Sequence, residues 1–126
     1  MLPGYENTAL KSLQNNQRNS FEPDILYISP KKISFITQRG IEGPPDLIVE
    51  ILSPFNSRTD MVTKKNTDLE FGVNEYWIVD PFQKNITVYT QSSGQNVPSH
   101  VFTGKDKVSS PSLSTLTFDL DRIFPV

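Results

Sequence analysis

Short apolar runs, separated by proline, glycine and polar turns, follow one another along the chain from residue 21 onward. Runs of this length that are rich in branched side chains predict β-strands. The run 47–52 is apolar at every position except Glu50, which is typical of a strand in the middle of a sheet with cover on both faces. Further strands are expected at 25–28, 33–37, 76–79, 86–89, 101–102 and 113–118.

One segment has the signals of a helix. Ser57 is a candidate N-cap with Asp60 three residues later, and Gly72 is suited to the position that follows a helix C-terminus. The sequence therefore predicts a helix over 58–71, and a final helical turn is expected at 119–124. The expected core contacts of the main helix are Met61, Val62, Leu69 and Phe71.

This order of elements predicts a fold of mixed α/β (α+β) class, with a mixed sheet and one main flanking helix. Residues 1–20 are polar and rich in Asn and Gln, and we interpret them as a leader before a domain at 21–126. One helix cannot cover both faces of the strand 47–52, so one face of the sheet is expected to stay partly open. Contiguous apolar surface marks a partner site or an aggregation liability, which predicts marginal stability or a homo-oligomer.

The composition of the chain excludes several classes of protein and of functional site. The 126 residues fit one domain, and the lack of cysteine excludes disulfide scaffolds, zinc ribbons and thiol nucleophiles. His100 is the single histidine, and the net charge of −2 gives no overall basic character that would indicate nucleic-acid binding. No apolar run approaches the ~20 residues of a membrane span, and residues 1–20 lack the apolar core of a signal peptide. We therefore expect no membrane partner and a cytoplasmic location.

Glu50 is the residue that the strand pattern does not explain. An ionised carboxylate among aliphatic side chains costs several kcal/mol unless it is paired or bound to a metal. Glu50 is therefore a solvent-facing residue, a structural ion-pair partner or part of a functional site.

Asp24 and Asp46, which both follow prolines, are the candidate partners of Glu50. A strand rises about 3.3 Å per residue, so Asp46 shares a face with Glu50 but lies about 13 Å away along the strand. If 24–29 and 46–52 are antiparallel neighbours, Asp24 falls beside the end of the other strand and the two carboxylates can share a Mg²⁺. If the run 33–37 lies between them, each Pro-Asp pair is a turn or a strand start.

A reaction that develops negative charge also needs a cation, and Lys64 and Lys65 lie on the predicted helix. Most helical lysines belong to a solvated face. Lys64 also lies four residues after Asp60, so an ordinary i,i+4 ion pair is open as well.

The stretch 45–54, PDLIVEILSP, resembles the core signature of the Uma2 family of restriction-endonuclease-like proteins. The resemblance continues through Asp60, Lys64 and the stretch 72–81, GVNEYWIVDP, and it reaches upstream to 22–29, EPDILYIS. It extends more weakly to Ser110 and 116–120, and so covers roughly residues 21 to 126.

The resemblance implies a PD-(D/E)XK nuclease-like fold and a Mg²⁺-dependent DNA endonuclease, with Mn²⁺ as an alternative ion. The usual site holds the ion with an Asp and a Glu on adjacent strands and adds a Lys two residues after the Glu. Leu52 occupies that last position here, and the family is thought to supply the lysine from the following helix. The implied residues are Asp24, Glu50 and Lys64, with Asp46 as the alternative metal ligand.

Two departures from the family pattern matter. Members usually carry a longer opening segment before the first Pro-Asp, so the chain is expected to be a shortened member. Asp68 stands where the family usually has Tyr, and a charge there weakens the core or marks an uncovered helix face. An inactive remnant and a non-catalytic interaction module therefore remain as alternatives to the endonuclease.

Overall fold

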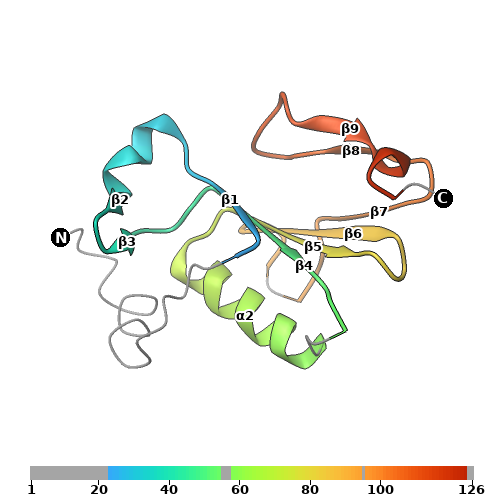
Figure 1. Cartoon of the computed structure of the whole chain (residues 1–126), viewed down its shortest axis with the longest axis horizontal. Coiled ribbons are helices and arrows are strands. Elements are labelled where there is room, and N and C mark those ends of the chain that lie inside the picture. Colours follow the sequence, from blue (N-terminus) through green and yellow to red (C-terminus); the bar gives the residue numbers. More distant parts are fainter. Residues whose placement is uncertain (1–22, 55–57, 95, 125–126) are drawn as a thin grey trace.

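A five-stranded mixed sheet with one helix against one of its faces forms the centre of the computed structural model (Figure 1). The structure describes residues 23–54, 58–94 and 96–124. The predicted mixed α+β class is confirmed. The sheet has the strand order β1-β4-β5-β6-β7, and the helix α2 connects β4 to β5. The bounds are β1 Ile25–Tyr27, β4 Leu47–Ile51, α2 Arg58–Phe71, β5 Glu75–Asp80, β6 Asn85–Thr90 and β7 His100–Thr103.

The register of β1 against β4 decides where the carboxylates fall. β1 pairs directly and antiparallel with β4, and Ile25 lies opposite Val49. β4 pairs in parallel with β5, as the crossover through α2 requires, and the remaining pairs of this sheet are antiparallel. The start of β1 therefore lies beside the end of β4.

The strand expected at 33–37 is largely wrong. A 3₁₀-helix, η2, covers Pro30–Phe35, and only Ile36–Thr37 form a short strand, β2, which pairs with β3 (Gly40–Ile41). Pro30 presets the backbone angle of a helical first turn, which the apolar pattern did not reveal. A Cβ at Gly43 would lie 2.5 Å from the Phe35 ring, so this hairpin folds tightly over Phe35. It does not separate β1 from β4.

Side chains that alternate along the strands divide the core into two clusters, one on each face of the sheet. The α2 face contains Ile48, Tyr76 and Ile78 from the strands and Leu52, which directly follows β4. The opposite face contains Leu47, Val49, Trp77, Val79, Ile86, Val88, Phe102, Val108 and Leu120.

The predicted helix bounds are confirmed, but its buried stripe was predicted only in part. Met61, Leu69 and Phe71 are buried as expected, whereas Val62 is exposed. Lys65 and Asp68 are buried instead, and the Lys65 ammonium lies 3.8 Å from the centre of the Tyr89 ring. Positions 61, 64, 65, 68 and 69 form the face toward the sheet, so polar residues occupy places where a sequence pattern expects apolar ones. None of the helices in the described part of the chain is long and apolar enough to cross a membrane.

The C-terminal part differs from its prediction. The strand expected at 113–118 is confined to β9 (Thr117–Asp119), which pairs with β8 (Lys107–Ser109), and the final turn is a 3₁₀-helix, η3, at Leu120–Arg122. Leu113 and Leu116 lie in the loop before β9 and pack against the sheet from there. β8 was missed because Val108 is its single apolar residue.

Glu75 joins this C-terminal hairpin to the sheet. Its buried carboxylate accepts hydrogen bonds from Ser110 Oγ at 2.8 Å, from the Ser112 backbone N–H at 3.1 Å and from the Ser112 hydroxyl. The other oxygen accepts one from Trp77 Nε1 at 2.6 Å. These donors explain why a charged residue is tolerated at a fully buried position.

Changing Glu75→Gln is expected to lower the free energy of unfolding by about 2 kcal/mol, because an amide NH₂ must then face a buried donor. Urea unfolding of the variant measures this. Glu70→Gln, at an exposed position of α2, serves as the control. Equal stability of wild type and Glu75→Gln would contradict the role given to this carboxylate.

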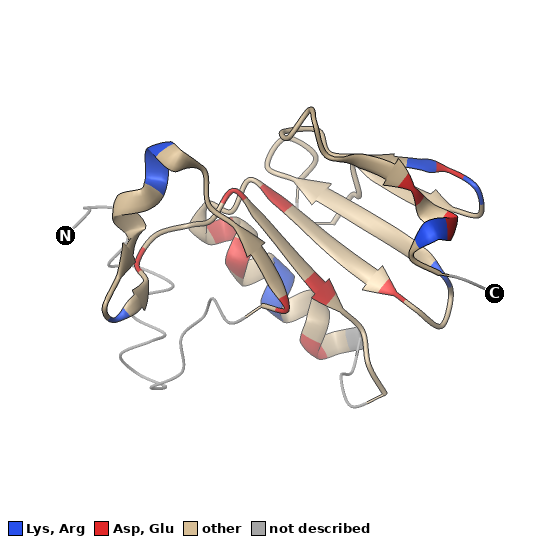
Figure 2. Cartoon of the chain, turned by 45° about the horizontal axis from the view of Figure 1, so that its top comes forward, with Lys and Arg blue, Asp and Glu red and all other residues tan. Residues whose placement is uncertain are grey.

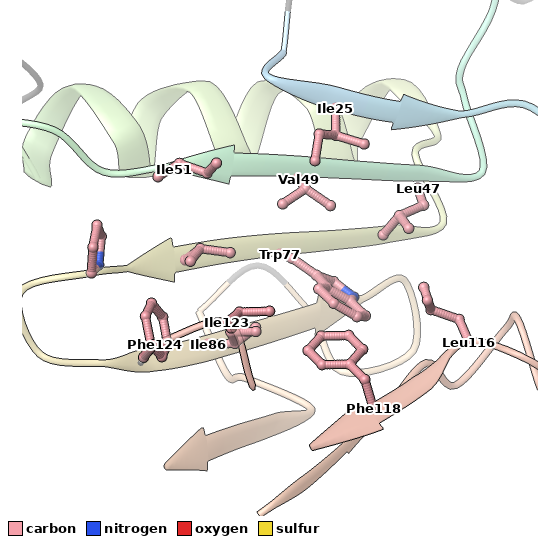
Figure 3. A pocket seen from close by; sticks show the side chains of 12 residues that line it. Ile25, Leu47, Val49, Ile51, Trp77, Ile86, Leu116, Phe118, Ile123 and Phe124 are labelled. Carbon is pink, nitrogen blue, oxygen red and sulfur yellow. The ribbon is translucent and has the colours of Figure 1, made fainter. Parts of the chain in front are cut away.

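The sheet face opposite α2 is only partly covered, as expected. An apolar groove of about 500 Å³ lies between the sheet and the C-terminal segment (Figure 3). Leu116, Phe118, Ile123 and Phe124 of the C-terminal segment line one side of it, and no second α-helix of the described residues lies on this face. The groove is lined by Ile25, Leu47, Val49, Ile51, Trp77, Val79, Pro81, Ile86, Leu116, Phe118, Ile123 and Phe124.

Candidate active site

The end of β4 and the middle of α2 bring opposite charges together. Glu50 follows Ile48 by two residues on β4, so its side chain points to the α2 face. Lys64 Nζ lies 2.6 Å from Glu50 Oε2. The Glu50 side chain is 6% exposed and that of Lys64 is 37% exposed, so the pair reaches from the core to the surface. The acidic and basic residues of α2 lie beneath the sheet in Figure 2.

Asp24 completes this group from the neighbouring strand. The register of Ile25 opposite Val49 continues to place Asp24 opposite Glu50. Asp24 Oδ2 accepts a hydrogen bond of 2.8 Å from the Ile51 backbone N–H, and the backbone N–H of Asp24 bonds to the Glu50 carboxylate. The direct pairing of β1 with β4 is thus the feature that brings Asp24 to Glu50.

Burial raises the pKa of the Glu50 carboxyl. The Lys64 ammonium opposes this rise, and the negative charge of Asp24 adds to it. Glu50 is thus paired with Lys64, and Asp24 adds a second negative charge beside it. The excess negative charge favours a further cation there.

Asp46 lies apart from this group, at the opposite end of β4. Its Oδ2 accepts a 2.6 Å hydrogen bond from the Ser29 backbone N–H, and its Oδ1 lies 3.2 Å from Lys32 Nζ. Burial alone would raise the pKa of Asp46, but the Ser29 N–H and the Lys32 ammonium outweigh it and lower this pKa. In this structure, Asp46 holds the turn after β1 against the start of β4.

The donor set at Asp24 and Glu50 fits a magnesium ion. Asp24 Oδ2 accepts the Ile51 N–H and Glu50 Oε2 faces the Lys64 ammonium, and a carboxylate has about four lone-pair sites, so each retains capacity for a ligand. The described residues contain no group of three or more His, Cys, Asp or Glu placed to hold a metal. Mg²⁺ commonly binds through one or two carboxylates and fills its octahedron with water and substrate phosphate, so two carboxylates suffice.

Two further residues lie beside this site. Asp68 is 1% exposed, so of its two interpretations the uncovered helix face is wrong, and the charge packed against the core remains. Burial raises the pKa of Asp68 to about 8, with the Lys64 charge opposing the rise and the Glu50 charge adding to it. Tyr76 on β5 is also fully buried, and burial, followed by the charge of Asp68, raises the pKa of its hydroxyl. The i,i+4 spacing from Lys64 to Asp68 was the available sequence signal.

The remaining candidates lie elsewhere. His100 is exposed on β7 and stacks on Phe102 with ring centres 4.2 Å apart. Asp60 is exposed near the start of α2. The Lys64 ammonium is paired with Glu50, so its interpretation as part of a purely solvated face does not hold.

Comparisons with known proteins agree with this architecture. A crystal structure described as "a putative nuclease belonging to DUF820" from Anabaena variabilis ATCC 29413 superposes with a TM-score of 0.66 at 27% identity. The match covers 81% of this chain and 58% of that one, so the chain spans less than two thirds of the neighbour's length. No curated protein matches significantly in sequence. The profile of the Uma2 family, described as "Putative restriction endonuclease", matches residues 6–121, and the chain belongs to the Uma2 family.

Proposed function

We propose that the chain is a metal-dependent endonuclease that hydrolyses phosphodiester bonds of DNA at Asp24, Glu50 and Lys64. One observation carries the proposal. The Lys64 ammonium lies 2.6 Å from the buried Glu50 carboxylate, and the strand beside Glu50 supplies a second carboxylate, Asp24. The family description and the nuclease description of the structural neighbour support this choice of chemistry.

Each residue has a distinct part in this proposal. Asp24 and Glu50 would hold Mg²⁺, or Mn²⁺ in its place, through the lone pairs that their protein contacts leave. A bound ion of this kind lowers the pKa of its water and offsets charge on the phosphate. Lys64 is partly exposed, so its ammonium can bind a non-bridging phosphate oxygen and stabilise the charge that develops there. Asp46 is the alternative ligand of the sequence analysis, and its engagement with Ser29 and Lys32 favours Asp24 instead.

A cleavage assay of the purified 126-residue chain on plasmid and linear DNA tests the proposal. Cleavage is expected with Mg²⁺ or Mn²⁺ and is expected to stop with EDTA. Asp24→Asn should impair it strongly, whereas Asp46→Asn should retain the metal dependence. Cleavage that persists in EDTA would overturn the metal-dependent reaction, and no cleavage with either ion would favour the inactive remnant.

A second candidate function, an interaction module, is favoured by the open apolar groove. Apolar surface of this kind typically marks a binding face, and a second copy of the chain is the partner that the sequence analysis predicted.

If the groove mediates self-association, Ile51→Lys should convert oligomers to monomers, because Ile51 lines the groove and is 39% exposed. Size-exclusion chromatography with light scattering measures this. Val62→Lys is a matched control, since Val62 is 38% exposed on α2 outside the groove. A wild-type chain that stays monomeric at high concentration would contradict the interaction role.

A further inference from the structure

Asp68 lies one helical turn after Lys64 on the face of α2 that packs against the sheet. Side chains four residues apart on a helix are neighbours, so the Asp68 carboxyl is within reach of the Lys64 stem and ammonium. The charges of Lys64 and Glu50 both act on the Asp68 carboxyl, which places all three groups in one neighbourhood. Asp68 is nevertheless 1% exposed, far more buried than Lys64.

The polar atoms behind Lys64 are incompletely satisfied. Asp68 Oδ2 and the Tyr76 hydroxyl are buried without a hydrogen-bond partner among the described residues. Buried polar groups are normally paired, and burial raises the pKa of Asp68 to about 8, so this carboxyl costs stability. Polar residues that break the packing rule in this way concentrate at functional sites.

We propose that Asp68 is a positioning residue that gives the Lys64 ammonium a second anchor beside Glu50. This role rests on the proposed function, in which Lys64 must stay at the site when a cation engages Glu50. Positive charge at Glu50 repels the ammonium, and a partly exposed lysine on a flexible stem then turns toward solvent unless another acceptor holds it. A carboxyl group accepts a hydrogen bond from an ammonium through its carbonyl oxygen in either protonation state.

The mobility of the Lys64 ammonium, measured by ¹⁵N relaxation of lysine NH₃⁺ groups, tests the proposal. The experiment uses the full 126-residue chain without metal or DNA, and the Lys64 signal is identified by its loss in Lys64→Arg. Three variants are compared: Glu50→Leu, Asp68→Leu and the double variant. Lys64 should remain ordered in both single variants and become as mobile as the exposed Lys84 in the double variant.

Two results decide the outcome. The double variant Glu50→Leu/Asp68→Asn keeps an acceptor at position 68 and should restore the order of Lys64, which a purely structural role of Asp68 would not do. Lys64 that becomes mobile in Glu50→Leu alone, or stays ordered in Glu50→Leu/Asp68→Leu, would overturn the proposal. The measurement involves no cleavage, so the two proposals can fail separately. A chain that shows the predicted pattern of Lys64 order but cleaves no DNA would refute the endonuclease and leave the second anchor standing.

Discussion

Changing Glu50→Ala is expected to reduce metal-dependent DNA cleavage by ~10³-fold or more, the scale on which loss of a central electrostatic group acts. The variant loses a proposed metal ligand and leaves the Lys64 ammonium without the carboxylate that lies 2.6 Å away. Lys64→Ala should impair cleavage with Glu50 intact, because the phosphate then loses its cationic contact. Single-turnover rates at saturating Mg²⁺ measure both effects.

A matched control separates chemistry from folding in this experiment. Glu70→Ala removes an exposed carboxylate from α2, the helix that carries Lys64, and should leave the cleavage rate unchanged. Circular dichroism of each variant checks that the sheet is retained. Full cleavage by Glu50→Ala protein would exclude the proposed site, since the metal would have lost its buried ligand.

The second large effect is a pH dependence of stability that comes from Asp68. Its pKa rises from 3.8 to about 8 on folding, because burial disfavours the ionised form. Below pH 4 the carboxyl is protonated in both states, so it carries no penalty there. Between pH 4 and 8 the unfolded chain ionises first, and the free energy of unfolding falls as the pH rises, by up to about 5 kcal/mol. Above pH 8 both states are ionised and the loss is complete.

Asp68→Asn should remove most of this slope and make the chain more stable than wild type at pH 8. Urea unfolding in EDTA at pH 5, 7 and 8.5 measures it. Glu50 adds a slope of the same sign because its pKa is also raised, whereas Asp46, whose pKa is lowered, acts below pH 4. Asp121→Asn, at an exposed position of η3, should follow the wild-type profile. Parallel profiles of wild type and Asp68→Asn would contradict the burial of this carboxyl in solution.

The regular elements could be predicted where side-chain pattern and end signals agree. The strand 47–52 and the helix 58–71 were found in this way, because an apolar run interrupted only by Glu50, and a helix start followed by glycine, leave few alternatives. The strand β8 could not be found, since Val108 is its single apolar residue. Leu113 and Leu116 pack from a loop, so their hydrophobicity was taken for a strand.

The site could be predicted in part because a single carboxylate in an aliphatic strand is visible in sequence. Glu50 and the candidates Asp24 and Asp46 followed from that anomaly, and the choice between the aspartates needed the β1–β4 register. Lys65 was not identified as buried, and the burial of Asp68 was left as one of two alternatives, because charged residues on a helix normally face solvent. Their burial depends on tertiary contacts, with the Tyr89 ring for Lys65 and with the Lys64 and Glu50 region for Asp68.

The central claim is that Asp24 and Glu50 together hold a divalent ion. Titration of ¹⁵N-labelled protein with Mn²⁺ tests it directly, because a bound paramagnetic ion broadens the amide signals nearest to it. The account predicts that the signals of Asp24, Glu50 and Ile51 disappear first, that Mg²⁺ competes the effect away, and that Glu50→Gln abolishes it. Broadening that begins at Lys32 and Asp46, or that spreads evenly over the acidic surface, would contradict the account.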